Sequence, residues 1–137
     1  MVRVRDGLVA GSVGAVLGSV PSSVYGVATG TLEKPTLAAG SILLPDEQRA
    51  DRLAVAAVPV HLGLSLGWGV ILAHLLPRRR PVTEGVMAGL TIAVLDLTMG
   101  RYVRRRVAEL PLAPQVADHL AYAIAVALTL SRRRGSR

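Results

Sequence analysis

The sequence contains no cysteine, no phenylalanine and a single lysine, Lys34, and its aromatic residues are one tryptophan and three tyrosines. Without cysteine the chain forms no disulfide, holds no metal through thiolates and has no cysteine nucleophile. Scarce aromatics argue against a surface that stacks nucleic-acid bases. Phosphate-binding loops, dinucleotide fingerprints, zinc-protease motifs and EF-hands are also missing. The sequence therefore predicts no enzyme, no cofactor and no nucleic-acid partner.

Charged residues are sparse as well, and they gather at the ends of apolar runs. They make up 18% of the chain, 51% is hydrophobic, and the mean hydropathy is +0.46; average soluble proteins are about 25% charged. The net charge of +7 comes almost entirely from arginine. Arginines that flank apolar segments are typical of membrane boundaries and contact anionic lipid headgroups. The blocks that suggest this role are Arg78, Arg79 and Arg80, then Arg104, Arg105 and Arg106, then Arg132, Arg133 and Arg134.

Four apolar segments are candidates for membrane spans: residues 7–30, 53–76, 85–102 and 116–130. A helix needs about 20 residues to cross the hydrocarbon core, so the fourth segment is the weakest candidate. It either begins earlier, around Leu110, or is a tilted or partial insertion. The first also resembles a secretory signal peptide, but its glycines and Pro21 favour a retained, kinked helix. Residues 30–52 are predicted to form a loop with a short interfacial piece. The predicted fold is an all-α polytopic membrane protein of four helices in one domain, residues 1–137.

An internal repeat is visible at the start of the first and third segments. Residues 6–18 match residues 84–96, with Gly7 and Gly11 aligned on Gly85 and Gly89. A looser match aligns residues 60–80 with residues 118–134 and His61 with His119. Matches that recur along the chain indicate duplicated structural units. We predict two copies of a helical hairpin, about residues 6–80 and 84–134.

Because each repeat contains two spans, both copies have the same orientation in the membrane, and this predicts the topology. Both termini and the arginine triplets at 78–80 and 132–134 then lie on one side, which the positive-inside rule makes cytoplasmic in a bacterial-type plasma membrane. Arg101 and residues 104–106 fall on the outer side, against the rule. Either protein or lipid headgroups shield these arginines, or the third and fourth segments do not both cross.

Small residues recur at helical spacing and predict close packing between helices. Residues at i, i+4, i+7 and i+11 share one helix face, and small side chains there let the backbones of membrane helices approach. The packing could be within the chain or between copies in a homo-oligomer. The glycines singled out are Gly7, Gly11, Gly14, Gly18, Gly63, Gly67, Gly85 and Gly89.

Asp96 is the one acid inside the third apolar segment, and the repeat places it on the small-residue face. A carboxylate within a membrane costs roughly 2.5–3.5 kcal/mol on insertion scales, which makes it a candidate functional residue. The simpler interpretation is an ion pair with Arg101 near the end of the helix. The functional interpretation is a proton relay or ion site in which Asp96 meets His61 and Ser65. A catalytic Asp-His-Ser triad has no supporting motif.

Two other interpretations of the histidines stay open. His74 and His119 lie near segment ends, where the membrane interface favours rings that have both a polar and an apolar part. Alternatively, His61 and His119 could ligate one haem between helices, since histidine is a common axial ligand.

The segments GLVAGSVGAV, EGVMAGLTIAV and HLGLSLGWGVILAHLLPRRR resemble small bacterial inner-membrane proteins of the YagU-like kind. The resemblance implies a few-helix membrane protein and carries over no functional residue. The leading functional prediction is a structural or accessory membrane module that packs through its glycine faces. The alternatives are a minimal transporter or channel that uses Asp96 and His61, and a haem-binding electron-transfer subunit.

Overall fold

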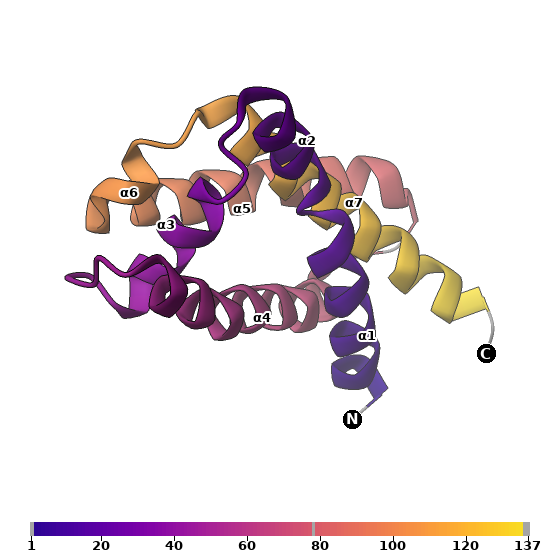
Figure 1. The fold of residues 1–137 in the computed structure, drawn as a ribbon. Coiled ribbons are helices and arrows are strands. Elements are labelled where there is room, and N and C mark those ends of the chain that lie inside the picture. Colours follow the sequence, from indigo (N-terminus) through magenta and orange to yellow (C-terminus); the bar gives the residue numbers. More distant parts are fainter. Residues whose placement is uncertain (1, 78, 136–137) are drawn as a thin grey trace.

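The computed structural model describes residues 2–77 and 79–135, without the side chains of residues 2, 134 and 135, and these ranges contain helices and no strand. The helices are α1 (Val2–Leu17), α2 (Val20–Thr29), α3 (Lys34–Leu43), α4 (Ala50–Leu75), α5 (Pro81–Val103), α6 (Arg105–Ala108) and α7 (Leu112–Gly135), as Figure 1 shows. The prediction of an all-α fold is confirmed.

Three stretches are long and apolar enough to cross a membrane, and they correspond to the first three predicted spans. They are α1 and α2 taken together (Arg3–Thr29), α4 and α5. The fourth predicted segment lies in α7, a helix of 24 residues, which is about 36 Å long at 1.5 Å per residue. Its length is sufficient for a crossing, but α7 is not among the three apolar stretches. The chain thus has the helices of a membrane protein.

The first span is broken between α1 and α2. Gly18 and Ser19 separate the two helices, and Pro21 lies in the first turn of α2. Proline is tolerated in a first turn, where its missing N–H needs no helical partner, whereas it interrupts a helix interior. The break therefore falls just ahead of Pro21, where the sequence predicts a kink. Helix α3, with ten residues, is too short to span, as predicted for this part of the chain.

Helix α7 runs through the centre of the bundle. It packs against α1, α2 and α5, and its side chains Tyr122, Ala123, Val126 and Leu130 belong to the main buried cluster. Neighbouring helices shield much of α7 from lipid, so its surface does not have to be uniformly apolar. This explains why the helix is less hydrophobic than the other three and why its sequence is the weakest membrane signal.

Glycines bring α1 onto α4 and α5 onto α7. A Cβ added at Gly7 would lie 2.6 Å from Cα of Val70, and one at Gly11 would lie 2.6 Å from the carbonyl oxygen of Ser65. Separations this short cannot hold a side chain, so the helix backbones themselves are in contact, as in GxxxG-type packing.

The same kind of contact joins α5 to α7. A Cβ added at Gly85 would lie 2.7 Å from Cα of Ile124, and one at Gly89 would lie 2.9 Å from the carbonyl oxygen of His119. Gly14 and Gly18 face the side chain of Tyr122 on α7, also at less than 3 Å from an added Cβ. Six of the eight glycines predicted to pack thus lie against a neighbouring helix.

Gly63 and Gly67 require a correction. Both are exposed on α4, and a Cβ added at either position meets no atom within 4 Å in the described part of the chain. Their spacing of four residues therefore does not mark a contact within the bundle. Glycine periodicity identifies a smooth helix face but not whether another helix covers it. Packing of this face against a second copy of the chain stays a prediction.

Both chain ends lie at one end of the molecule (Figure 1). Arg133 forms an ion pair with Asp6 at 2.9 Å, which ties the last turns of α7 to the first turns of α1. Arg3 donates to the carbonyl oxygen of His74 near the end of α4 at 3.5 Å. The exposed residues Arg79, Arg80 and Arg132 belong to the same end. Arg78 and the side chain of Arg134 lie outside the described residues.

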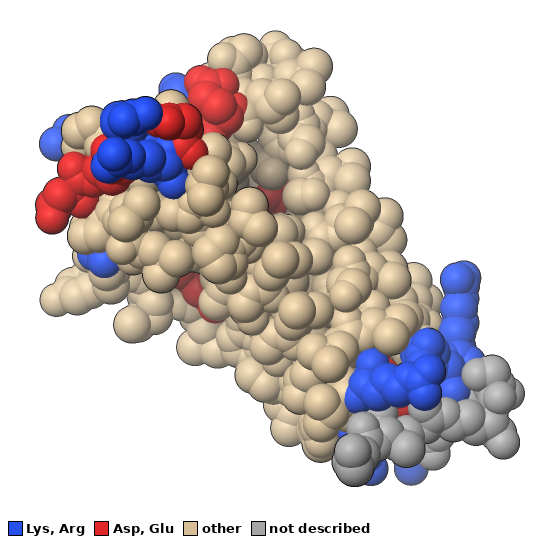
Figure 2. Space-filling model, turned by 60° about the horizontal axis from the view of Figure 1, so that its bottom comes forward, with Lys and Arg blue, Asp and Glu red and all other residues tan. Residues whose placement is uncertain are grey.

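The opposite end holds α3, α6 and most of the acidic residues. Its carboxylates are Glu33, Asp46, Glu47, Asp51 and Glu109. Surface ion pairs join Arg49 to Asp51 and Arg105 to Glu109, both at 2.8 Å. Figure 2 shows a middle zone without Lys or Arg between the two charged ends. This pattern matches a bundle whose middle meets lipid tails and whose ends meet headgroups and water.

Arg104, the residue after α5, is held by carbonyl oxygens of α3. Arg104 donates from Nε to the carbonyl oxygen of Ser41 at 2.9 Å and from a terminal nitrogen to that of Ile42 at 3.3 Å, both in the last turn of α3. The last carbonyls of a helix lack helical donors and carry its negative dipole end. Protein atoms thus shield Arg104, whereas the side chain of Arg105 is exposed beside Glu109.

Candidate functional site

A half-open cavity of about 630 Å³ is lined by residues of α1, α2, α3, α4, α5 and α7. Most of its wall is apolar, with side chains such as Val58, Leu62 and Ile92. It exists because α4 and α5 do not pack along their length, whereas α1 packs closely on α7. Volumes of roughly 300–1,000 Å³ are typical of small-molecule sites.

Asp96 of α5 is the central polar group of this cavity. Its Oδ2 and Oδ1 accept hydrogen bonds from Nε1–H of Trp68 on α4, at 3.1 and 3.3 Å. Nε2 of His119 on α7 lies 3.6 Å from Oδ2, within ion-pair range. The carboxylate is therefore approached from two different helices, and a quarter of its side chain, 25%, stays exposed to the cavity.

The expected ion pair between Asp96 and Arg101 is not what the structure shows. Arg101 donates to the carbonyl oxygens of Leu110 at 3.1 Å and Ala108 at 2.8 Å, so it stabilises the end of α6. The two side chains are five residues apart, which turns them to different faces of α5. Asp96 points inward and Arg101 points to the segment that follows its own helix.

The hydrogen bonds of His119 determine where its protons lie. Nδ1 is 2.7 Å from the carbonyl oxygen of Gln115, which only accepts, so Nδ1 carries a hydrogen. A neutral ring with this tautomer would turn the lone pair of Nε2 toward the Asp96 carboxylate. Two facing lone pairs repel, so the geometry favours a proton on one of the two partners. The geometry thus places Asp96 and His119 so that they can share one proton.

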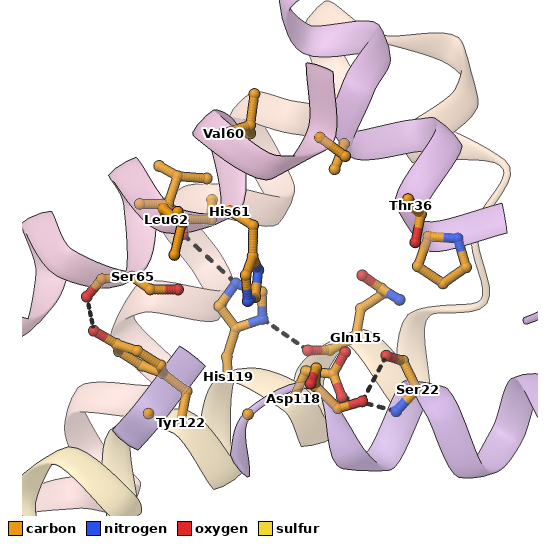
Figure 3. A pocket seen from close by; sticks show the side chains of 18 of the residues that line it. Ser22, Thr36, Val60, His61, Leu62, Ser65, Gln115, Asp118, His119 and Tyr122 are labelled. Atoms are coloured by element: carbon orange, nitrogen blue, oxygen red, sulfur yellow. Dashed lines mark hydrogen bonds and ion pairs between the residues drawn. The ribbon is translucent and has the colours of Figure 1, made fainter. Parts of the chain in front are cut away.

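His61 and Ser65 line the same cavity as Asp96, as the sequence predicts, but neither is its direct partner. Nε2 of His61 lies 3.1 Å from the carbonyl oxygen of Ala15 and donates to it. The backbone carbonyl of the buried Ser65 accepts a hydrogen bond from the hydroxyl of Tyr122. Figure 3 shows these side chains with His119 in the pocket and the hydrogen bond between Tyr122 and Ser65.

A second carboxylate, Asp118, faces the break in the first span. Its Oδ1 accepts a hydrogen bond of 2.8 Å from the backbone N–H of Ser22 (Figure 3). Ser22 lies in the first turn of α2, where backbone N–H groups have no helical acceptor, and Ser19 provides no side-chain cap. Asp118 therefore caps α2 from a different helix, and its negative charge meets the positive end of the α2 dipole.

The sequence analysis did not identify Trp68, Asp118 or Tyr122 as site residues, and it interpreted His119 as an interface residue or a haem ligand. One signal was available. Positions 61, 65 and 68 share a face of α4, and positions 115, 119 and 122 share a face of α7 at the same spacing. Each face holds polar or aromatic side chains in an otherwise apolar helix, but only the tertiary structure shows that the two faces meet.

The side chains that line the cavity limit the ligands that it can hold. The lining includes two carboxylates and two histidines, and among the described residues no Lys or Arg contributes to it. The described chain also has no cluster of three or more His, Asp or Glu that could hold a metal ion. Haem ligation by His61 and His119 is disfavoured, because Nε2 of the former engages a carbonyl and Nε2 of the latter faces Asp96.

Comparison with known proteins adds no family to this picture: no protein-family model, curated protein or solved structure gives a significant match to the chain.

Proposed function

We propose that the protein is a minimal membrane transporter or channel that carries a small solute or a proton through the cavity at Asp96. The observation that supports this function is the contact of 3.6 Å between Oδ2 of Asp96 and Nε2 of His119 at the cavity of the helical bundle. Ionisable side chains within a membrane are costly and are typical of ion paths and proton relays. A purely structural module, the leading prediction from sequence, has no need of such a pair or of a cavity of about 630 Å³.

The proposed architecture has four spans, with α7 as the fourth, arranged as two repeated hairpins. The supporting observation is the match between their glycine contacts. Gly7 meets Val70 and Gly11 meets Ser65, while Gly85 meets Ile124 and Gly89 meets His119. The two glycines of α5 follow those of α1 by 78 positions. Their contact residues on α7 follow those on α4 by 54 positions in both cases. In this structural match His119 corresponds to Ser65. The sequence match instead pairs His119 with His61, which lies one helical turn before Ser65.

We place the end that holds both termini in the cytoplasm of a bacterial-type plasma membrane, because the arginine triplets flank the helices there. The absence of native cysteine allows a direct test with single-cysteine variants. Arg105→Cys, whose side chain is 92% exposed at the α6 end, should react with a membrane-impermeant maleimide in intact cells. Arg132→Cys should react only after permeabilisation. The reverse pattern would invert the proposed orientation, and labelling of both in intact cells would exclude four complete spans.

Transport can be measured with purified protein in liposomes. We expect the wild type to move at least one probe among protons, K⁺, chloride, tetraphenylphosphonium and glucose faster than empty liposomes. Asp96→Asn removes the charge and the proton-holding pair while it keeps the side-chain volume, so this flux should fall by roughly tenfold or more, as expected when a group central to an ion path is lost.

Glu109→Gln is the matched control for that experiment, because it removes a carboxylate from a surface ion pair that does not line the cavity. Its flux should equal that of the wild type. Emission of the single tryptophan, Trp68, checks that each variant is folded. Equal fluxes of all probes for the wild type, Asp96→Asn and empty liposomes would contradict a transport function.

A structural or accessory role through self-association is the second candidate. The exposed glycine face at Gly63 and Gly67 favours it, because nothing in the described chain covers this face and small-residue faces are typical of helix contacts in membranes. Self-association and transport are compatible, since the cavity lies within one chain.

A further inference from the structure

The charges that line the cavity select the sign of its ligand. The ionisable groups that face it are His61 from α4, Asp96 from α5, and Asp118, His119 and Tyr122 from α7. The lining residues from α1, α2 and α3 are apolar side chains, glycines, serines and a threonine. With one proton shared by Asp96 and His119, the cavity carries the negative charge of Asp118, and it carries two negative charges once that proton has left. No Lys or Arg among its described lining residues compensates these charges. A cation is therefore favoured in it and an anion is repelled.

Only one of the two carboxylates is available to such a cation. Asp118 is engaged with the first turn of α2 through Ser22. Asp96 receives one indole N–H from Trp68 and otherwise faces His119, with 25% of its side chain exposed to the cavity. The proton that this pair holds is the only counter-charge that a cation would have to replace.

The rest of the wall selects the type of cation. Ca²⁺ is held by several oxygen ligands, among them carboxylates, and the described residues contain no group of three or more His, Cys, Asp or Glu that could hold a metal ion. The cavity instead offers apolar side chains such as Val58 and Leu62, together with the aromatic rings of Trp68 and Tyr122. Aromatic faces attract organic cations, and apolar walls bind an apolar body.

We infer that the cavity binds a monovalent organic cation with an apolar body, which displaces the proton shared by Asp96 and His119. The inference rests on the proposed function and specifies its substrate class. Before binding, the pair is neutral with its proton. After binding, Asp96 is a carboxylate beside the cation, His119 is neutral with its hydrogen on Nδ1, and one proton has left to solvent. No bond other than that to the proton is made or broken, and the charge in the cavity is unchanged.

Tetraphenylphosphonium is a suitable probe. Its binding to purified protein in detergent can be followed through Trp68, the single tryptophan and a direct neighbour of Asp96. A pH-indicator dye in weakly buffered solution counts the protons released. We expect one proton per bound cation, and an affinity that falls up to about tenfold for each pH unit of acidification where the pair is protonated.

Matched probes and variants separate the possible outcomes. Tetraphenylborate has the same shape with a negative charge, and it should bind at least about tenfold more weakly, since the cavity repels anions. Asp96→Asn should weaken tetraphenylphosphonium binding by a similar factor and abolish proton release. His119→Gln keeps the carboxylate and removes the second proton site, so it should still bind the cation while proton release per cation falls. Glu109→Gln should behave as the wild type.

Equal binding of the cation and the anion would overturn the inference, as would binding without proton release or full binding by a folded Asp96→Asn variant. If Asp96→Asn does not fold, unchanged proton release by His119→Gln would overturn it. Failure here can be told apart from failure of the proposed function. Flux of K⁺ or chloride that depends on Asp96, without tetraphenylphosphonium binding, would leave a transporter with another substrate. The absence of any flux that depends on Asp96 would remove both.

Discussion

Replacement of Gly11 by alanine is expected to destabilise the bundle severely, and replacement by leucine is expected to prevent its assembly. A Cβ at this position would lie 2.6 Å from the carbonyl oxygen of Ser65 and 3.2 Å from Cα of Leu66. Both are backbone atoms of α4, so no rotamer change can make room. Overpacking of protein cores typically costs about 1–3 kcal/mol, and here the two helices would have to separate. We expect Gly11→Ala to lose at least about 3 kcal/mol, the upper end of that range.

Gly63 supplies the matched control. Like Gly11, it lies in a stretch long and apolar enough to span a membrane, but a Cβ added there meets no described atom within 4 Å. Gly63→Ala should leave the unfolding temperature in detergent unchanged or raise it, since alanine favours helix by roughly 0.8–1.0 kcal/mol over glycine. Thermal unfolding followed by Trp68 emission measures both variants. Similar losses for Gly11→Ala and Gly63→Ala would show that the α1–α4 contact is not as tight as described. Dissociation of a dimer by Gly63→Leu would instead support self-association through α4.

Loss of the acceptor at Asp118 should be nearly as damaging. Asp118→Leu removes the oxygen that accepts the N–H of Ser22 at 2.8 Å and places an apolar side chain at the start of α2. Helix caps are typically worth about 0.5–2 kcal/mol in water, and an unsatisfied backbone group in a lipid environment costs several kcal/mol. We expect a loss of about 2–4 kcal/mol in detergent on the same grounds.

Asp118→Asn separates the hydrogen bond from the charge. Its side-chain oxygen can still accept from Ser22, so most of the stability should return, apart from the roughly 0.3–1 kcal/mol of the charge–dipole interaction. The measurement is the unfolding temperature of both variants beside the wild type. If Asp118→Asn were as unstable as Asp118→Leu, the charge and not the cap would be the role of this residue. If both were as stable as the wild type, the link between α7 and α2 would carry no stability.

The sequence determined the elements of this protein because they depend on local properties. Apolar length predicted α4 and α5 and the stretch Arg3–Thr29. The rigid φ angle and missing N–H of Pro21 predicted the break in the first span. Helical periodicity placed Gly7, Gly11, Gly85 and Gly89 on faces where backbones approach, and each of them lies against another helix. These signals require no knowledge of which helices are neighbours.

The tertiary structure alone decided which faces meet. The partners of Asp96 come from positions 28 and 23 residues away, and Ser22 is capped by a residue 96 positions further along the chain. Periodicity assigns a residue to a face of its helix but does not say what that face contacts, and so Gly63 and Gly67 look like packing residues although they face no neighbour in the described chain. For the same reason the sequence suggests an ion pair between Asp96 and Arg101, which the structure does not contain. Only the assembly of α4, α5 and α7 shows that Asp96 lies 3.6 Å from His119 at the cavity.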